Sequence, residues 1–307
     1  MSQPAEPTRP KLPTEVIHLY NLFIHGEISR RDFMDGVQRF ATGGLAAAAI
    51  IDALMPNYAL GQQVSKTDDR IKATYETVPS PQGNGSIKGY LVRPASADGR
   101  SDKPTKLPGI LVVHENRGLN PHIEDIARRL ALANFMAFAP DGLTSLGGFP
   151  GDDYKGGQMF GKVDRKKMSE DFVAAAMALK SRADCTGKIG VTGFCYGGGT
   201  SNALAVRLGA DLAAAVPFYG GAPAAEDVPK IKAAILVHHG ELDTRLAAAW
   251  PAYDAALKAA NVPHEGYIYP GAVHGFHCDA TPERYNKAAA DVAWQRTIDW
   301  FNKYVRA

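Results

Sequence analysis

From about residue 70 to the end of the chain, short apolar runs alternate with longer amphipathic stretches. The apolar runs predict strands at residues 73–78, 86–92, 109–114, 135–139, 188–192, 213–218, 233–238 and 265–269. The amphipathic stretches predict helices, among them residues 121–130, 171–182 and 200–206 and a last helix after Tyr285. Most of the strands are apolar throughout, which is typical of strands buried on both faces of a parallel sheet. The pattern therefore predicts an α/β fold with a mostly parallel sheet and helices on both faces.

Two stretches depart from this alternation. Residues 73–78 and 86–92 are separated by the turn-forming residues 81–85, which predicts an antiparallel pair. Residues 141–167 are long, polar and rich in glycine, aspartate and lysine. We expect them to form part of a cap or rim over the site, because long loops in compact domains usually serve function.

The chain begins with a stretch that fits neither pattern. We therefore divide the chain into an N-terminal segment of residues 1–65 and an α/β domain of residues 66–307. Within the first segment, residues 14–23 predict a short amphipathic helix that ends near His25–Gly26. Two interpretations of the following residues stay open, one as an export signal and one as a structural extension.

The export interpretation rests on the paired Arg30 and Arg31. A weakly apolar stretch at residues 40–51 and small residues at 59–61 follow them, which resembles a twin-arginine signal with a cleavage site and predicts a periplasmic protein. In the structural interpretation, Ser29 is a helix N-cap and Asp32 completes a capping box. The segment is then a helical extension packed on the α/β domain, and the protein is cytoplasmic.

A glycine-rich turn follows the predicted strand at residues 188–192. Its sequence from Gly193 through Cys195 to Gly197 has the form G-x-nucleophile-x-G, and a predicted helix follows. A strand, a tight turn of this form and a helix make the nucleophile elbow of α/β-hydrolases. Here Cys195 takes the place of the usual serine. The alternative is a structural cysteine buried in a glycine-rich turn.

Candidate partners of Cys195 follow the next strands. Asp243 comes after the strand at 233–238, and His274 comes after the strand at 265–269. Nucleophile, acid and base then occur in the chain order that α/β-hydrolases use. The imidazole would take the thiol proton, and the carboxylate would fix the imidazole tautomer. Alone, Asp243 would be interpreted as a turn or cap residue and His274 as an ordinary loop histidine; Glu241 is the next candidate for the acid.

One further carboxylate separates the chain from a generic hydrolase. Glu115 follows the strand at 109–114, where the loop that forms an oxyanion hole should begin. At this point the sequence resembles the dienelactone hydrolase family, over about residues 70–305. The motifs that carry the resemblance are His114-Glu115-x-x-Gly118-Leu119, Gly193-Phe194-Cys195-Tyr196-Gly197-Gly198, Gly240-x-x-Asp243 and His274-Gly275-Phe276.

The resemblance implies an α/β-hydrolase fold and assigns roles to these residues. Cys195 would be the nucleophile, activated by Glu115 and by the Asp243–His274 pair. In the family the resting cysteine is an inactive thiol, and substrate binding lets the glutamate take its proton. The backbone N–H groups of Tyr196 and Asn116 would form the oxyanion hole.

The substrate is less well defined by the resemblance. Known members bind the carboxylate of a dienelactone with arginines, one of them shortly after the catalytic histidine. Here no arginine follows His274 until Arg284. Arg117 and Arg245 could bind a carboxylate instead, with Phe276 as a further substrate contact, although surface ion pairs are the commoner role of arginine. Carboxymethylenebutenolide is therefore only the substrate expected by default, and another lactone or small ester is equally compatible.

Composition narrows the class of protein. The chain has 307 residues and a net charge of +2 without a long Lys/Arg-rich run, so nothing indicates nucleic acid as a partner. No apolar run reaches the ~18 residues of a membrane span. Two groups of potential metal ligands, His238 with His239 and His274 with His277 and Cys278, lack the spacing of a preorganised site. We expect no metal and no cofactor, and a small molecule as the partner; the oligomeric state is open.

The sequence thus predicts a lactone or ester hydrolase with a Cys-Asp-His triad and a thiol-activating glutamate. One alternative is a general carboxylesterase or a cysteine peptidase-like acyl hydrolase with the same triad. A less favoured alternative is a non-catalytic scaffold that only binds a ligand, because such a scaffold usually lacks one or more triad residues.

Overall fold

A computed structural model of the chain describes residues 12–24, 27–41, 47–58, 61–95 and 106–306. Within these residues the strands form one eight-stranded sheet in the order β1-β2-β4-β3-β5-β6-β7-β8. The strands are β1 (Ile71–Ser80), β2 (Gly85–Pro94), β3 (Leu107–Val113), β4 (Met136–Pro140), β5 (Cys185–Phe194), β6 (Ala214–Phe218), β7 (Ala234–Gly240) and β8 (His264–Tyr269). β1 pairs antiparallel with β2, and β2 with β4, whereas all the other pairings are parallel. The predicted α/β-hydrolase architecture is confirmed.

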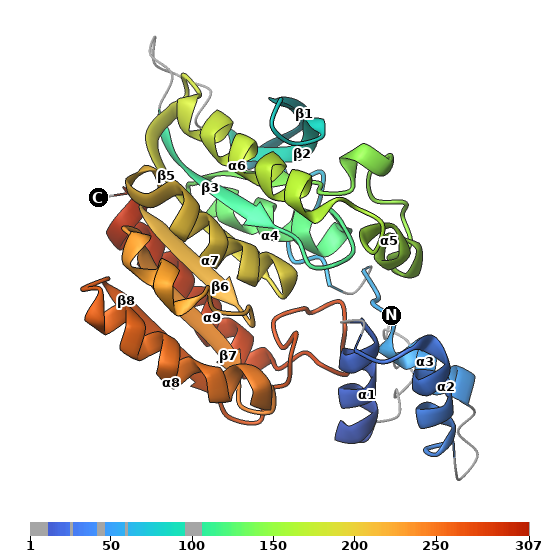
Figure 1. The fold of residues 1–307 in the computed structure, drawn as a ribbon. Coiled ribbons are helices and arrows are strands. Elements are labelled where there is room, and N and C mark those ends of the chain that lie inside the picture. Colours follow the sequence, from blue (N-terminus) through green and yellow to red (C-terminus); the bar gives the residue numbers. More distant parts are fainter. Residues whose placement is uncertain (1–11, 25–26, 42–46, 59–60, 96–105, 307) are drawn as a thin grey trace, which may run out of the picture.

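Helices cover both faces of the sheet (Figure 1). They are α4 (Pro121–Leu132), α5 (Asp153–Phe160), α6 (Arg165–Ser181), α7 (Tyr196–Leu208), α8 (Thr244–Ala259) and α9 (Lys287–Phe301). One core cluster joins α4 and α9 to the sheet, and a second joins α6, α7 and α8 to the opposite face. The central strands are buried along their whole length, as in β3, which explains their continuous apolar sequences.

The polar interval at 141–167 contains more helix than the sequence predicts. α5 begins after its N-cap Asp152, and α6 begins at Arg165 rather than at Asp171. The side chain of Asp164 accepts the backbone N–H groups of Lys166 and Lys167 and so caps α6. The first turn of α6 is charged and solvent-facing, so its apolar periodicity starts only later in the sequence.

Three helices precede the sheet and form a separate cluster, here called the N-terminal helical unit: α1 (Thr14–Ile24), α2 (Arg30–Gln38) and α3 (Ala47–Leu54). The unit lies beyond the carboxyl ends of the central strands (Figure 1). The predicted capping box is present, because Ser29 Oγ accepts the N–H of Asp32 at 3.2 Å and Asp32 Oδ2 accepts that of Ser29 at 3.1 Å. His25–Gly26 and two of the small residues, Ala59 and Leu60, lie outside the described residues.

Hydrogen bonds tie the segment between this unit and β1 to the sheet and its covering helices, here called the hydrolase body. Asp125 on α4 accepts the backbone N–H groups of Gln63 and Val64 at 3.2 and 2.8 Å, and Val64 belongs to the core cluster of α4 and α9. Among the described helices, none has the length and apolar character needed to cross a membrane.

Candidate active site

Cys195 lies at the sharp turn between β5 and α7. Its backbone has φ 56° and ψ −111°, a region that non-glycine residues rarely adopt. A Cβ on Gly193 would lie 2.1 Å from the carbonyl oxygen of Gly197, and one on Gly197 would lie 2.2 Å from that of Val113. These glycines let the strand and the helix approach closely, while the strained turn presents the thiol at the helix N-terminus. The predicted elbow geometry is present.

Asp243 and His274 meet at the ends of β7 and β8. Asp243 is the N-cap residue of α8, and His274 lies in the loop after β8. The Nδ1–H of His274 donates to Asp243 Oδ2 at 2.5 Å, and both side chains are largely buried. The other neighbour of His274 is the side chain of Cys195. The structure thus brings the three residues together in the order nucleophile, base, acid.

Electrostatics favours the charged form of His274. Burial alone would lower its pKa, but the Cys195 sulfur and the hydrogen bond to Asp243 raise the pKa to about 10. Burial would raise the pKa of Asp243, yet the hydrogen bond from His274 holds this pKa below its usual value. A histidine whose pKa is raised is a stronger base toward a neighbouring thiol.

The other candidate acid has a different partner. The Glu241 carboxylate accepts the backbone N–H of Gly271 at 2.8 Å and is exposed. It stabilises the turn after β8 rather than His274. Of the two carboxylates, Asp243 is therefore the one that contacts His274.

Two of the histidines considered above as potential metal ligands, His238 and His277, are core residues. His238 is hydrogen-bonded to the hydroxyls of Tyr269 and Thr297, and His277 packs against the rings of Phe194 and Phe218. Burial lowers the pKa of both histidines well below the usual value. Across the described ranges, no three His, Cys, Asp or Glu side chains gather as potential ligands of a metal ion.

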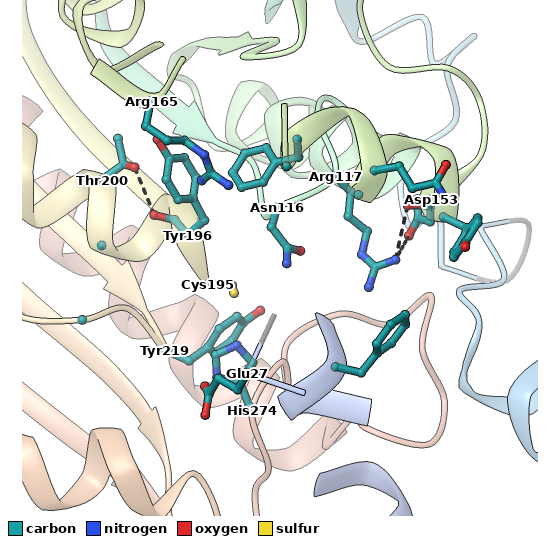
Figure 2. Close-up of a pocket in the computed structure, with 18 of the residues that line it drawn as sticks. Glu27, Asn116, Arg117, Asp153, Arg165, Cys195, Tyr196, Thr200, Tyr219 and His274 are labelled. Carbon is teal, nitrogen blue, oxygen red and sulfur yellow. Dashed lines mark hydrogen bonds and ion pairs between the residues drawn. The ribbon is translucent and has the colours of Figure 1, made fainter. Parts of the chain in front are cut away.

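A pocket of about 910 Å³ opens at Cys195. Figure 2 shows the thiol between Asn116 on one side and His274 and Tyr219 on the other. Tyr196 is the first residue of α7, and Asn116 follows β3; both line the pocket, which places the two proposed oxyanion-hole residues beside the nucleophile. The interval 141–167 also lines the pocket, as expected, through residues of α5 and the start of α6.

Glu115 lies behind the pocket wall rather than on it. It is 8% exposed and is not among the residues that line the cavity. Its charge contributes to raising the pKa of Arg117 and of Arg284, against the effect of burial. Burial and, after it, the charge of Glu115 raise the pKa of the Cys278 thiol to about 12. Glu115 is thus in electrostatic reach of two buried arginines and a buried thiol.

The three expected substrate contacts lie in different places. Arg117 lines the pocket, buried, with its Nη2 donating to Tyr20 Oη at 3.1 Å and its Nη1 3.7 Å from Asp153 Oδ2 (Figure 2). Arg245 lines the pocket from an exposed position at the start of α8. Phe276 does not line the cavity; it is fully buried and packs edge-on against the ring of Tyr219.

Tyr219, which the sequence analysis does not single out, is a wall of the pocket. It follows β6 with a φ of 37°, is 1% exposed and faces Cys195 (Figure 2). Its hydroxyl has no hydrogen-bond partner among the described residues. Burial, with smaller contributions from Glu115, Cys278 and Cys195, raises its pKa well above the usual value, so the hydroxyl keeps its proton. A strained residue with an unpaired buried donor beside a nucleophile is a candidate for substrate contact.

Arg284 is the second residue that the sequence analysis does not place in the site. It is 6% exposed, and a Cβ on Gly275, next to His274, would lie 2.9 Å from its Nη1. Its Nε has no partner among the described residues. The loop after His274 folds back, so Arg284, near the other end of the same loop, lies beside Gly275, the neighbour of His274.

Comparisons with known proteins agree on one family. The sequence pattern described as "Dienelactone hydrolase family" matches residues 87–305. A protein of Escherichia coli O157:H7 named "Putative carboxymethylenebutenolidase" is 32% identical over 257 residues, which cover 78% of this chain and 90% of that protein. The "Putative hydrolase fragment YghX" of Escherichia coli K12 is 54% identical over 120 residues, 39% of this chain and 97% of the fragment. A crystal structure titled "Putative Dienelactone Hydrolase" from Klebsiella pneumoniae superposes with a TM-score of 0.65 at 28% identity, covering 76% of this chain and 99% of that one.

Proposed function

The chain belongs to the dienelactone hydrolase family and is a carboxylic-ester hydrolase; from this premise we propose that it cleaves a lactone or small ester through Cys195, with Asp243 and His274 completing the triad. One observation carries the proposal. An elbow cysteine and a hydrogen-bonded Asp–His pair meet at one pocket that also presents a helix N-terminus.

The proposed reaction has two halves. His274 takes the thiol proton, and the thiolate adds to the ester carbonyl. The resulting oxyanion accepts hydrogen bonds from the N–H groups of Tyr196 and Asn116. When the intermediate collapses, the leaving alkoxide takes the proton from His274 and a thioester remains. Water then attacks the thioester while His274 takes its proton, and collapse releases the acid and returns the proton to the sulfur.

Glu115 is proposed to activate the thiol when substrate binds. Its charge contributes to the raised pKa of Arg284 and, after Tyr20, Asp153 and Tyr58, to that of Arg117, while Cys195 lies beside His274. An anionic substrate that reaches these arginines would compete with Glu115 for them. With the charge of these arginines neutralised by the substrate, Glu115 would take the proton of a thiol that faces it, in place of His274. In this route His274 starts protonated and still protonates the leaving alkoxide, and the proton held by Glu115 returns to the sulfur when the acid is released. Substrate binding would thereby activate the cysteine.

Three pocket residues are proposed to contact the substrate. Arg117 and Arg245 supply positive charge, and Tyr219 supplies a hydroxyl that stays protonated and can donate to a substrate oxygen. Phe276 acts indirectly, by supporting the ring of Tyr219 from the core.

A panel of lactones and p-nitrophenyl esters, assayed on the wild type and on Cys195→Ala, tests the proposal. We expect the variant to lose activity by at least about 10⁴-fold, because the nucleophile acts as a unit with its base. Cys185→Ala is the matched control, because Cys185 is a buried thiol at the far end of the same strand. Activity that survives in Cys195→Ala would refute the site. Rapid ester turnover without lactone turnover would favour the general esterase, and no turnover at all the non-catalytic scaffold.

A further inference from the structure

Part of the pocket wall comes from outside the hydrolase body. Phe23 on α1, Glu27 between α1 and α2, and Arg30 in the first turn of α2 line the same cavity as Cys195. Phe23 presents an apolar ring that is stacked on Phe33 at a centroid distance of 4.8 Å. The N-terminal helical unit therefore contributes both an apolar and a charged surface to the pocket.

Specific contacts hold this unit against the site. Tyr20 accepts a hydrogen bond from Arg117, and the Tyr58 hydroxyl donates to Asp153 Oδ1 at 2.6 Å. Val273, the neighbour of His274, packs against the apolar cluster of the unit. The unit is thus fixed to the loop of the proposed catalytic histidine, and the segment that follows α3 is fixed to the first residue of α5.

Only one of the two adjacent arginines at the start of α2 lines the pocket. Successive residues of a helix point about 100° apart, so Arg30 and Arg31 cannot face the same side of α2. Arg30 lines the cavity, and its guanidinium carbon lies 5.5 Å from the ring centroid of Tyr154 on α5. Arg31 is exposed and does not line the cavity. The Arg30–Tyr154 contact joins two lining residues of the pocket, one from the N-terminal helical unit and one from α5.

The charge and the volume of the pocket indicate which class of substrate it binds. Among the described residues, four arginines line the pocket against two carboxylates, and one of these, Asp153, is already paired with Arg117 and Tyr58. Arg165 stacks 3.7 Å above Phe160 and has no carboxylate partner among the described residues. A cleft with an excess of one charge attracts ligands of the opposite charge. The volume lies at the upper end of the ~300–1,000 Å³ typical of small-molecule sites, which leaves room beyond the scissile bond.

We propose that the N-terminal helical unit is the specificity wall of the pocket and receives the distal part of an ester or lactone with an apolar body and an anionic end. The apolar body packs against Phe23, and the anionic end pairs with Arg30. This inference rests on the proposed hydrolysis at Cys195 and adds the class of substrate to it.

The test compares p-nitrophenyl esters of three acyl groups: acetate, octanoate and the monoester of suberic acid, which is octanoate with a terminal carboxylate. The full-length wild type should show a lower KM for the suberate ester than for octanoate. Arg30→Ala should reduce the suberate-to-octanoate preference in kcat/KM about fivefold, as for an ion pair at a partly solvated mouth. Arg30→Glu should reverse the preference. Phe23→Ala should reduce the preference of octanoate over acetate about tenfold, the effect of lost apolar contacts.

Arg31→Ala is the matched control and should keep the wild-type preferences. Equal effects of Arg30→Ala and Arg31→Ala would overturn the inference, as would an unchanged chain-length profile in Phe23→Ala. Melting curves of each variant check that the fold is retained. The two proposals fail differently: ester turnover in Cys195→Ala refutes the site itself. An inactive Cys195→Ala combined with unchanged preferences in the wall variants refutes only the role of the helical unit.

Discussion

The two sides of the pocket are built in different ways. On the hydrolase side, Cys195, Asp243 and His274 each follow a strand, and their positions are set by the parallel sheet. On the opposite side, Phe23 and Arg30 come from helices that have a core of their own and reach the pocket only by docking. The carboxyl ends of parallel strands meet at one edge, so the catalytic residues need no further element to bring them together.

This difference separates chemistry from selectivity. Changes on the strand-end side should reduce turnover of every ester, because they remove groups that act on the scissile carbonyl. Changes on the helical side should alter the ranking of substrates, because they contact only the distal part. Loops and added segments commonly carry specificity on a fixed scaffold. The predictions below test where this division holds.

Asp243→Asn should have the largest effect of these changes. The amide cannot hold the imidazolium as the carboxylate does, and the analogous change in a serine triad lowers kcat by ~10⁴-fold. The fold should be retained, because Asp243 lies at the start of α8 outside the core clusters. Steady-state kinetics with one p-nitrophenyl ester measures the loss. Glu241→Gln is the control, and a larger loss in this control than in Asp243→Asn would identify Glu241 as the acid.

Whether the sequence predicts a residue of this site depends on where that residue lies, directly after a strand or inside an irregular loop. Cys195, Asp243 and His274 are predictable because each follows a strand whose apolar run is visible and whose end is marked by glycine. The sequence predicts Phe276 as a substrate contact, but the loop after His274 turns and buries its ring in the core. The same turn of the loop brings Arg284 beside Gly275, behind the residues that line the pocket. No local pattern encodes the path of such a loop.

The helical side is predictable only in part. The pattern of Ser29 and Asp32 predicts the capping box, and residues 14–23 predict α1. That these helices dock over Cys195 depends on contacts such as Tyr20 with Arg117, which join residues distant in sequence. The position of Tyr219 in the pocket is equally unpredictable from the sequence, because it depends on a backbone φ of 37°.

Glu115→Gln should have the next largest effect, and it separates a thiol switch from a permanently activated cysteine. Glutamine keeps the shape but cannot take a proton, so turnover should fall by ~10²-fold or more, the range of general-base catalysis. In the wild type without substrate, Cys195 should react slowly with iodoacetamide at neutral pH, and an anionic ligand should speed the reaction. Alkylation rates of the two proteins, measured by mass spectrometry, test this.

The opposite result is equally informative. A standing thiolate beside an imidazolium is alkylated fast without any ligand. Fast alkylation of the free wild type, or normal turnover in Glu115→Gln, would mean that His274 alone activates Cys195. Glu115 would then serve only as the electrostatic partner of Arg117 and Arg284.

Tyr219→Phe should have a smaller effect, because it removes one donor and leaves the triad in place. We expect kcat to fall about tenfold, at the lower end of what a lost hydrogen bond to a transition state costs. The fold should be unaffected, because the hydroxyl has no partner in the described structure and the ring is kept. The loss should be similar for acetate and octanoate esters. A change confined to long esters would place Tyr219 with the specificity wall instead.

The smallest expected effect is a change with pH in the melting-temperature difference between the wild type and Asp243→Asn. The pKa of His274 is raised from 6.5 to about 10 against the effect of burial, by Cys195 and then by Asp243, so folding favours its protonated form. The contribution of the His274–Asp243 pair is therefore fully present below pH 6.5 and is lost as the pH rises through about 10. The difference in melting temperature between the wild type and Asp243→Asn should be largest near pH 6.5 and shrink by pH 10. Titration of Cys195 occurs in both proteins and largely cancels in this difference. A difference that stays constant or grows with pH would show that His274 is neutral in the folded enzyme, and that Asp243 only orients it.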